Sequence, residues 1–201
     1  MLSTLTSHLA TRRVILASQS PRRVELLRHC GIAFDVVPST FEENLPKNQF
    51  ASPELYVLEN AKQKANEVRQ RIVIGCDTVV VHQGQILEKP RDEQDAFRML
   101  SRLVGDAHDV CSGVAIFSSA LGKEPHLFSE KTTVVFGKVD PQVIEDYIKT
   151  GESMDKAGSY GLQGQARVFV SEIHGCINNL IGFPVQRLGL ELTKLVDDGN
   201  L

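Results

Sequence analysis

The fold of this chain is decided by the stretch Val14-Ile15-Leu16-Ala17-Ser18-Gln19-Ser20-Pro21-Arg22-Arg23. Its four leading apolar residues are typical of a buried strand. A helix is expected to begin directly after them, with Ser20 as the N-cap, Pro21 at the first helical position and Gly31 just beyond its end. A buried strand that passes through a short loop into a helix is the building unit of α/β proteins. We therefore expect an α/β fold.

The same alternation of strand and helix patterns continues along the chain. Further strands are expected at residues 34–38, 72–82, 86–90, 110–117, 132–139 and 168–173. Further helices are expected after Ser52-Pro53, at residues 92–104, after Asp140-Pro141 and after Pro184. Residues 1–201 fit a single domain, either compact or split into two lobes by a cleft.

Composition excludes several classes of protein. The 22 basic and 25 acidic residues give a formal net charge of -3 at pH 7, which argues against a nucleic-acid partner. No stretch approaches the roughly 20 apolar residues that a membrane helix needs, so no membrane partner is expected. The four cysteines are widely spaced and form no C-x-x-C pair, which favours a reducing, cytoplasmic location.

A candidate anion site lies at the start of the first predicted helix. A helix N-terminus carries free backbone donors and a partial positive charge, and Arg22 and Arg23 add two cations where the dipole disfavours them. A bound phosphate would turn this cost into a gain, and the Ser18 and Ser20 hydroxyls are additional donors. The alternative is a capped surface helix with solvated arginines.

Asp77 interrupts the apolar run at residues 72–82. A carboxylate in a buried strand is unfavourable unless it is paired, hydrogen-bonded or bound to a metal. This predicts a general base or a metal ligand, and the alternative is an aspartate that caps a bulge or turn.

Several charged residues complete the set of groups needed for phosphate chemistry. Lys64 lies on the helix after Ser52, and Lys89 lies in Glu88-Lys89-Pro90. Lysines can offset phosphate charge, and carboxylates such as Glu43 can hold Mg²⁺ or Mn²⁺. Each of these residues has a simpler interpretation as a solvated surface group.

The segment 155–164 places polar side chains among glycines that permit close approach to a ligand. Gln163 within it can read the edge of a nucleobase through its paired donor and acceptor groups. A structured surface loop is the alternative. The glycines fit neither the dinucleotide-binding nor the P-loop pattern. His108 is expected to be a hydrogen-bonded strand residue.

Taken in order, these motifs resemble the Maf family of nucleoside triphosphate pyrophosphatases. The resemblance covers nearly the whole chain. It rests on Ser18-x-Ser20-Pro21-Arg22-Arg23-x-Glu25-Leu26-Leu27, Glu42-Glu43, Ala61-x-x-Lys64-Ala65, Gly75-x-Asp77-Thr78, Glu88-Lys89-Pro90, His108-x-Val110, Ser112-Gly113-Val114, Tyr147 to Gly151, Asp155 to Gly164 and Asn179 to Pro184.

The resemblance implies hydrolysis of a nucleoside triphosphate to the monophosphate and pyrophosphate with a divalent metal, Mg²⁺ or Mn²⁺. It also implies an elongated mixed β-sheet flanked by helices, two lobes with a central cleft, and a homodimer. The forms of the motifs around Asp77 and Gln163 are similar to those of the family branch that acts on dTTP and UTP. A role in clearing non-canonical nucleotides is a further expectation.

The resemblance also implies roles for individual residues. Asp77 is the proton acceptor, and Arg22, Thr78 and Gln163 are the specificity positions. The other functional positions that match are Lys64, Lys89 and Glu43. From the residues themselves, Glu43 and Asp77 are candidate metal ligands, and the candidate substrate contacts include Ser18, Ser20 and Arg23. The chain departs from the family pattern at Cys76, at Ser112 and at residues 165–167.

Two other functions stay open at this point. One is a regulatory protein that binds a nucleotide without turnover, and the other is a pyrophosphatase for modified purine nucleotides such as N7-methyl-GTP. The chain also resembles the Maf half of a eukaryotic fusion with a methyltransferase-like domain. Since the sequence stops at Leu201, no methyltransferase activity is expected.

Overall fold

The computed structural model describes residues 2–68 and 72–201, and it confirms the α/β fold. The helices are α1 (Leu2–Ala10), α2 (Pro21–His29), α3 (Pro53–Glu67), α4 (Glu93–Leu103), α5 (Pro141–Lys149), α6 (Ile177–Ile181) and α7 (Val185–Asp197). The strands are β1 (Val14–Ala17), β2 (Asp35–Val36), β3 (Ile72–His82), β4 (Gln85–Leu87), β5 (Ala107–Ser118), β6 (His126–Phe136) and β7 (Val170–His174). Short 3₁₀ turns lie at Lys47–Gln49, Ala157–Ser159 and Gln165–Phe169.

The seven strands of the described residues form one mixed sheet, in the order β2-β1-β3-β5-β6-β7, with β4 paired to β3. β1 runs parallel to both β2 and β3, whereas β4 is antiparallel to β3 and β7 is antiparallel to β6. The predicted mixed sheet with flanking helices is therefore confirmed.

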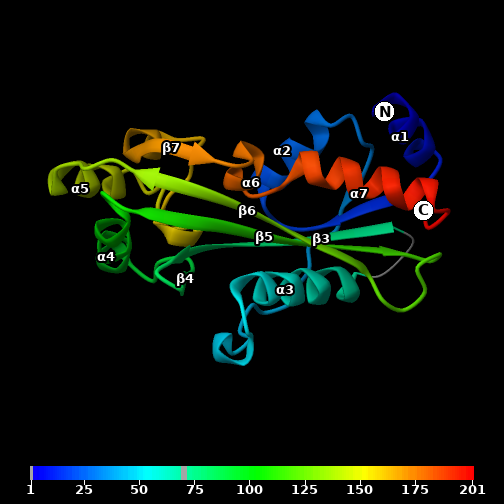
Figure 1. Ribbon diagram of the computed structural model, residues 1–201, viewed down its shortest axis with the longest axis horizontal. Coiled ribbons are helices and arrows are strands. Elements are labelled where there is room, and N and C mark those ends of the chain that lie inside the picture. The colour runs from blue at the N-terminus through cyan, green and yellow to red at the C-terminus, as the bar shows by residue number, and fades with distance from the viewer. Residues whose placement is uncertain (1, 69–71) are drawn as a thin grey trace. The chain divides into compact units, whose positions relative to one another are not determined.

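The described chain divides into two compact units. The first comprises residues 1–77, 112–130 and 182–201, and the second comprises residues 78–111 and 131–181. In the first unit, α3 covers one face of the sheet, while α2 and α7 lie on the other (Figure 1). Each unit has an apolar core of its own. The cleft expected between two lobes stays a prediction.

The turn from β1 into α2 follows the prediction with one difference. Ser20 is the N-cap residue and Pro21 opens the helix, but the Ser20 side chain accepts no capping hydrogen bond. The backbone N–H of Ser20 instead donates to Ser18 Oγ at 3.2 Å. The hydroxyl that orders this turn therefore comes from the end of β1. Gly31 follows the helix with φ +71°, as a helix-terminating glycine does.

Three other helices begin at the positions that were predicted from their N-terminal capping residues. The Ser52 hydroxyl accepts from the Leu55 N–H at 3.3 Å, and this fixes the start of α3. Aspartates serve the same role for α4 and α5. Asp92 Oδ1 accepts from the Asp95 N–H at 2.7 Å, and Asp140 Oδ1 accepts from the Gln142 N–H at 2.8 Å.

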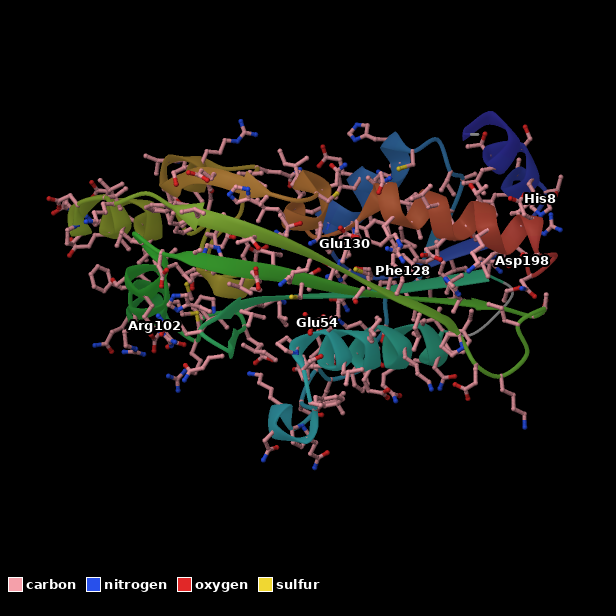
Figure 2. The ribbon with its side chains drawn as sticks, viewed as in Figure 1. His8, Glu54, Arg102, Phe128, Glu130 and Asp198 are labelled. Atoms are coloured by element: carbon pink, nitrogen blue, oxygen red, sulfur yellow. The ribbon has the colours of Figure 1, made fainter. Side chains whose placement is uncertain are left out.

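The sequence did not predict α1 or α6, and the strand expected at residues 168–173 begins two residues later because a 3₁₀ turn precedes it. α1 is a short amphipathic helix whose Leu5 and Leu9, one turn apart, are buried. The His8 ring Nε2 donates to the Leu201 carbonyl oxygen at 3.1 Å, which joins α1 to the end of the chain (Figure 2). Such a helix depends on a partner that is remote in sequence, so its local pattern is weak.

Two glycines let α3 approach the sheet closely. A Cβ at Gly75 on β3 would lie 2.2 Å from the Ala61 carbonyl oxygen, and a Cβ at Gly113 on β5 would lie 2.5 Å from the Val57 carbonyl carbon. Both contacts are with the α3 backbone, which cannot move aside as a side chain can. Glycine at these two positions therefore sets the distance between α3 and the strands.

No helix among the described residues combines the length and the apolar character that crossing a membrane requires.

Alanine at Gly113 is expected to destabilise the protein, because the added Cβ would overlap the α3 backbone. Overpacking of this kind costs about 1–3 kcal/mol, which corresponds to a fall in Tm of roughly 2–12 °C in a chain of this size. Gly189 inside α7 is the matched control, since a Cβ there meets nothing within 4 Å. Gly189→Ala should raise Tm slightly, because alanine favours helix. Equal shifts in thermal melting of the two variants would contradict the close-approach argument.

Candidate active site

Asp77 lies within the continuous strand β3 and is 3% exposed. Its neighbours Cys76 and Val79 are buried as well, so the carboxylate is set in an apolar strand as predicted. It caps neither a bulge nor a turn. The burial of this charge therefore requires partners from another element of the fold.

Lys64 on α3 is the main partner of Asp77. Its Nζ donates to Asp77 Oδ1 at 2.7 Å and to Glu43 Oε1 at 2.8 Å, and its side chain is only 9% exposed. Lys62, two residues earlier, instead forms a surface ion pair with Glu124 at 2.9 Å. The solvated interpretation is thus wrong for Lys64.

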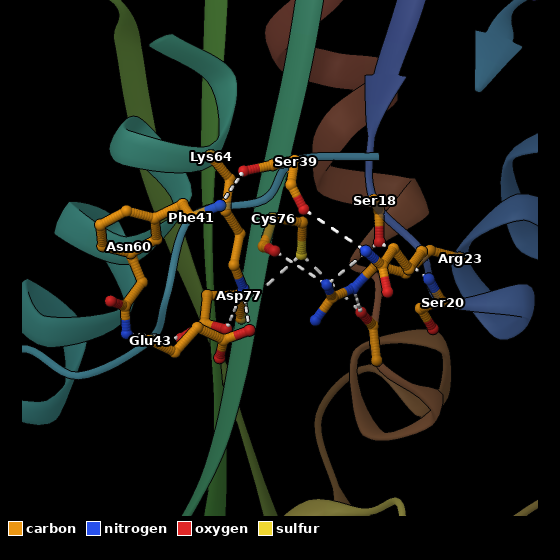
Figure 3. Close-up of polar contacts among 12 residues, drawn as sticks. Ser18, Ser20, Arg23, Ser39, Phe41, Glu43, Asn60, Lys64, Cys76 and Asp77 are labelled. Atoms are coloured by element: carbon orange, nitrogen blue, oxygen red, sulfur yellow. Dashed lines mark hydrogen bonds and ion pairs between the residues drawn. The ribbon is translucent and has the colours of Figure 1, made fainter. Parts of the chain in front are cut away.

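Asn60 is a second partner of Asp77 that sequence reasoning missed. Its Nδ2 donates to Asp77 Oδ2 at 2.9 Å, and the residue is completely buried. Asn60 and Lys64 are one turn apart on α3 and lie on the same face of the helix. Figure 3 shows both side chains, together with Glu43, converging on Asp77. The available signal was an asparagine one helical turn before the candidate lysine.

These contacts set the ionisation of Asp77. Burial opposes the charged form, but the nearby charges of Lys64 and Arg23 and the hydrogen bonds from Lys64 and Asn60 outweigh it. Together they hold the pKa of Asp77 below its ordinary value. The carboxylate is therefore ionised at neutral pH and accepts hydrogen bonds on both oxygens.

Arg23 is fixed by backbone acceptors. Its guanidinium donates to the Cys76 carbonyl oxygen at 2.8 Å, to the Gly182 carbonyl oxygen at 3.1 Å and to Ser18 Oγ at 3.4 Å. The side chain thus joins α2 to the end of β1, to β3 beside Asp77, and to the segment before α7 (Figure 3). The solvated interpretation is wrong for Arg23.

The loop that carries Glu43 is held by another residue that the sequence did not reveal. Glu67, at the end of α3, accepts from the backbone N–H groups of Thr40 at 2.8 Å and Phe41 at 3.0 Å. It also accepts from the hydroxyls of Ser39 and Thr40. The hydrogen bonds from these hydroxyls and N–H groups hold the pKa of Glu67 below its ordinary value. The polar loop at 39–43 is therefore anchored to the helix that supplies Lys64.

The remaining predicted residues divide between the two units. In the first unit, Ser18 is buried at the end of β1, while Ser20 and Arg22 are partly exposed at the start of α2. In the second unit, Thr78 is partly exposed on β3, and Lys89 and Gln163 are exposed.

Two hydrogen bonds order the glycine-containing segment 155–164 within the second unit. The Gly158 N–H donates to the Glu88 carbonyl oxygen at 3.0 Å, joining this segment to the one that carries Lys89. Tyr160 and His108 Nε2 share a hydrogen bond of 2.7 Å, and both residues are buried. Burial lowers the pKa of His108 to about 4, so the ring is neutral. The prediction that His108 is a hydrogen-bonded strand residue is confirmed.

The four cysteines are free, as their spacing predicted.

Comparison with known proteins gives a consistent result. The family model described as Maf-like protein matches residues 13–195. The probable bifunctional dTTP/UTP pyrophosphatase/methyltransferase protein of Homo sapiens is 46% identical over 200 residues, which are 92% of this chain and 32% of that protein. The chain thus spans about a third of the human relative.

Bacterial relatives match over nearly their whole length. The dTTP/UTP pyrophosphatase of Agathobacter rectalis is 44% identical over 91% of this chain and 97% of its own. That of Clostridium kluyveri is 45% identical over 88% of this chain and 94% of its own. The order of motifs from Ser18 to Pro184, the family match and these identities together show that the chain belongs to the Maf family.

Proposed function

We propose that this protein hydrolyses nucleoside triphosphates, with dTTP and UTP as the main substrates, to the monophosphate and pyrophosphate. The observation that carries the proposal is the buried Asp77 carboxylate, held ionised by Lys64 and Asn60 on a strand of the first unit. A buried charge with this support is typical of a functional site. The names of the relatives supply the substrate class.

In the proposed reaction, Asp77 orients a water molecule for attack on the α-phosphorus. The water oxygen forms a bond to phosphorus, the bond from the α-phosphorus to the bridging oxygen breaks, and pyrophosphate leaves with that oxygen. The proton of the water passes to the Asp77 carboxylate and then to solvent. A depressed pKa keeps Asp77 in its accepting form at neutral pH, although it also makes Asp77 a weaker base.

The cationic residues have the complementary task. Negative charge increases on the departing pyrophosphate, so cations placed beforehand around it stabilise the transition state most. Arg22, Arg23, Lys64 and Lys89 are proposed for this role, with Ser18 and Ser20 as hydroxyl donors. Thr78 and Gln163 are proposed to select the pyrimidine base.

The residues around Lys64 suit a divalent cation, Mg²⁺ or Mn²⁺. Glu43 and Asp77 each place one carboxylate oxygen within 2.8 Å of Lys64 Nζ, so the two carboxylates lie near each other, and carboxylate oxygens are ligands that these cations prefer. Within the described part of the chain, no group of three or more His, Cys, Asp or Glu side chains is placed so that it could hold a metal ion. Glu43 and Asp77 would therefore hold the cation together with phosphate oxygens and water. A bound cation would neutralise part of the triphosphate charge.

Four expectations from the sequence stay predictions: a single domain over residues 1–201, a homodimer, a cytoplasmic location, and the absence of nucleic-acid and membrane partners.

The substrate assignment is tested by measuring pyrophosphate and orthophosphate released from dTTP, UTP, CTP, GTP and N7-methyl-GTP, with Mg²⁺ and with a chelator. We expect metal-dependent pyrophosphate from dTTP and UTP. Preferred turnover of N7-methyl-GTP would assign the protein to the modified-purine class. Binding without any release would favour the regulatory function.

Asp77→Asn is expected to lower kcat by about 10²–10⁴-fold, the usual contribution of a general base. The variant keeps the shape of the side chain but removes its charge. Asp109→Asn is the matched control, because Asp109 is also a strand aspartate bound to a lysine and a threonine, at 3.3 Å from Lys131 and 2.7 Å from Thr133. The control should retain activity. An unchanged kcat in Asp77→Asn would remove Asp77 from the mechanism.

Arg22→Ala is expected to lower kcat/KM for dTTP by about 10- to 100-fold, since a hydrogen bond to a charged group contributes ~1.5–3 kcal/mol. Arg28→Ala serves as the control, because Arg28 is exposed in the last turn of the same helix. Steady-state kinetics at several dTTP concentrations measure the effect. Equal kcat/KM values in the two variants would favour the solvated interpretation of Arg22.

A further inference from the structure

Asn60 occupies an unusual position on α3. The buried residues of this helix are Tyr56, Val57, Asn60, Ala61, Lys64 and Ala65. Most of these side chains are apolar, but Asn60 carries an amide and Lys64 carries a charge. Both donate hydrogen bonds to Asp77. The proposed function uses Lys64 both as a partner of Asp77 and as a phosphate cation, whereas Asn60 enters it only as a donor that helps to keep Asp77 ionised.

The two donors divide the Asp77 carboxylate between them. Lys64 Nζ lies 2.7 Å from Oδ1, and Asn60 Nδ2 lies 2.9 Å from Oδ2. A carboxylate that is held at one oxygen can turn about its Cβ–Cγ bond, but one held at both oxygens cannot. Since both donors stand one turn apart on the same helix, they fix the plane of the carboxylate relative to α3.

The orientation of the Asn60 amide follows from the same chemistry. An ionised carboxylate only accepts hydrogen bonds, so the amide must present its NH₂ group to Asp77. The opposite atom, Asn60 Oδ1, is then buried without a hydrogen-bond partner. A buried acceptor without a partner lowers stability, and an apolar side chain of similar size would avoid that loss. The benefit of Asn60 must therefore come through the group it holds.

We propose that Asn60 is a positioning residue, which holds the Asp77 carboxylate in the one orientation that directs water at the α-phosphorus. The proposal rests on the role of Asp77 given above. Small errors in the placement of a reacting group have large kinetic effects, and a displacement of 1 Å can cost about 10²-fold in rate. Asn60 acts here through Asp77 and does not touch the nucleotide.

The main variant is Asn60→Leu, which keeps the volume of the side chain and removes the donor. We expect kcat to fall by about 10- to 100-fold while KM for dTTP stays within about twofold, because binding groups are unchanged. Asn60→Ser introduces a polar side chain that is too short to reach Oδ2. It should likewise lower kcat and leave KM for dTTP little changed. It also keeps the test valid if the leucine variant folds poorly.

Asn179→Leu is the matched control for the loss of a buried asparagine. Asn179 is also fully buried, but its Nδ2 donates to the Val110 carbonyl oxygen and to Thr132 Oγ1, each at 3.0 Å. Its replacement should lower Tm and leave kcat of the folded fraction little changed. If Asn60→Leu behaves in the same way, Asn60 is only structural and the proposal is overturned.

A double-mutant cycle separates the two proposals. If Asn60 acts through Asp77, the variant carrying both Asn60→Leu and Asp77→Asn should have the same kcat as Asp77→Asn alone. Additive losses would overturn the positioning role while the role of Asp77 survives. Full turnover by Asp77→Asn, or no turnover by the unmodified protein, would overturn the role of Asp77 and that of Asn60 with it.

Discussion

A buried ion pair between Lys64 on α3 and Asp77 on β3 constrains the rest of the first unit. Each charge loses several kcal/mol of hydration on burial, and the attraction between the two offsets that loss only when the geometry is good and the remaining lone pairs are used. That condition is met because Asn60 donates to Asp77 at 2.9 Å and Glu43 accepts from Lys64 at 2.8 Å. The helix must also lie close to the strand, which Gly75 and Gly113 permit.

The sequence predicted the parts of this arrangement that depend on neighbours along the chain. The strand around Asp77, the start of α3 at Ser52 and the turn from β1 into α2 each follow from local periodicity or capping, and the structure confirms them. The expectation of a functional carboxylate came from a single misplaced charge in an apolar strand. The helices α1 and α6 were missed. Short helices owe their stability to packing against distant segments, and these two lack the Ser-Pro or Asp-Pro pair that marks the starts of α2, α3 and α5.

The partners of the site residues were harder to predict, because they lie far apart in sequence. Asn60 and Asp77 are 17 residues apart, and Thr40 and Glu67 are 27 apart. No local pattern connects such residues until α3 is placed on the sheet. The i, i+4 spacing of Asn60 and Lys64 was visible beforehand, but it shows only that they share a helix face. What that face meets is a property of the tertiary structure.

Arg23 shows how a residue that was singled out for its charge can also have a structural task. The sequence pointed to its charge, while the structure adds three acceptors, at Cys76, Gly182 and Ser18. A cation that is already fixed by backbone carbonyls loses little conformational freedom when an anion arrives. Lys64 is also held, by the carboxylates of Asp77 and Glu43, so the fold itself places both of these cations.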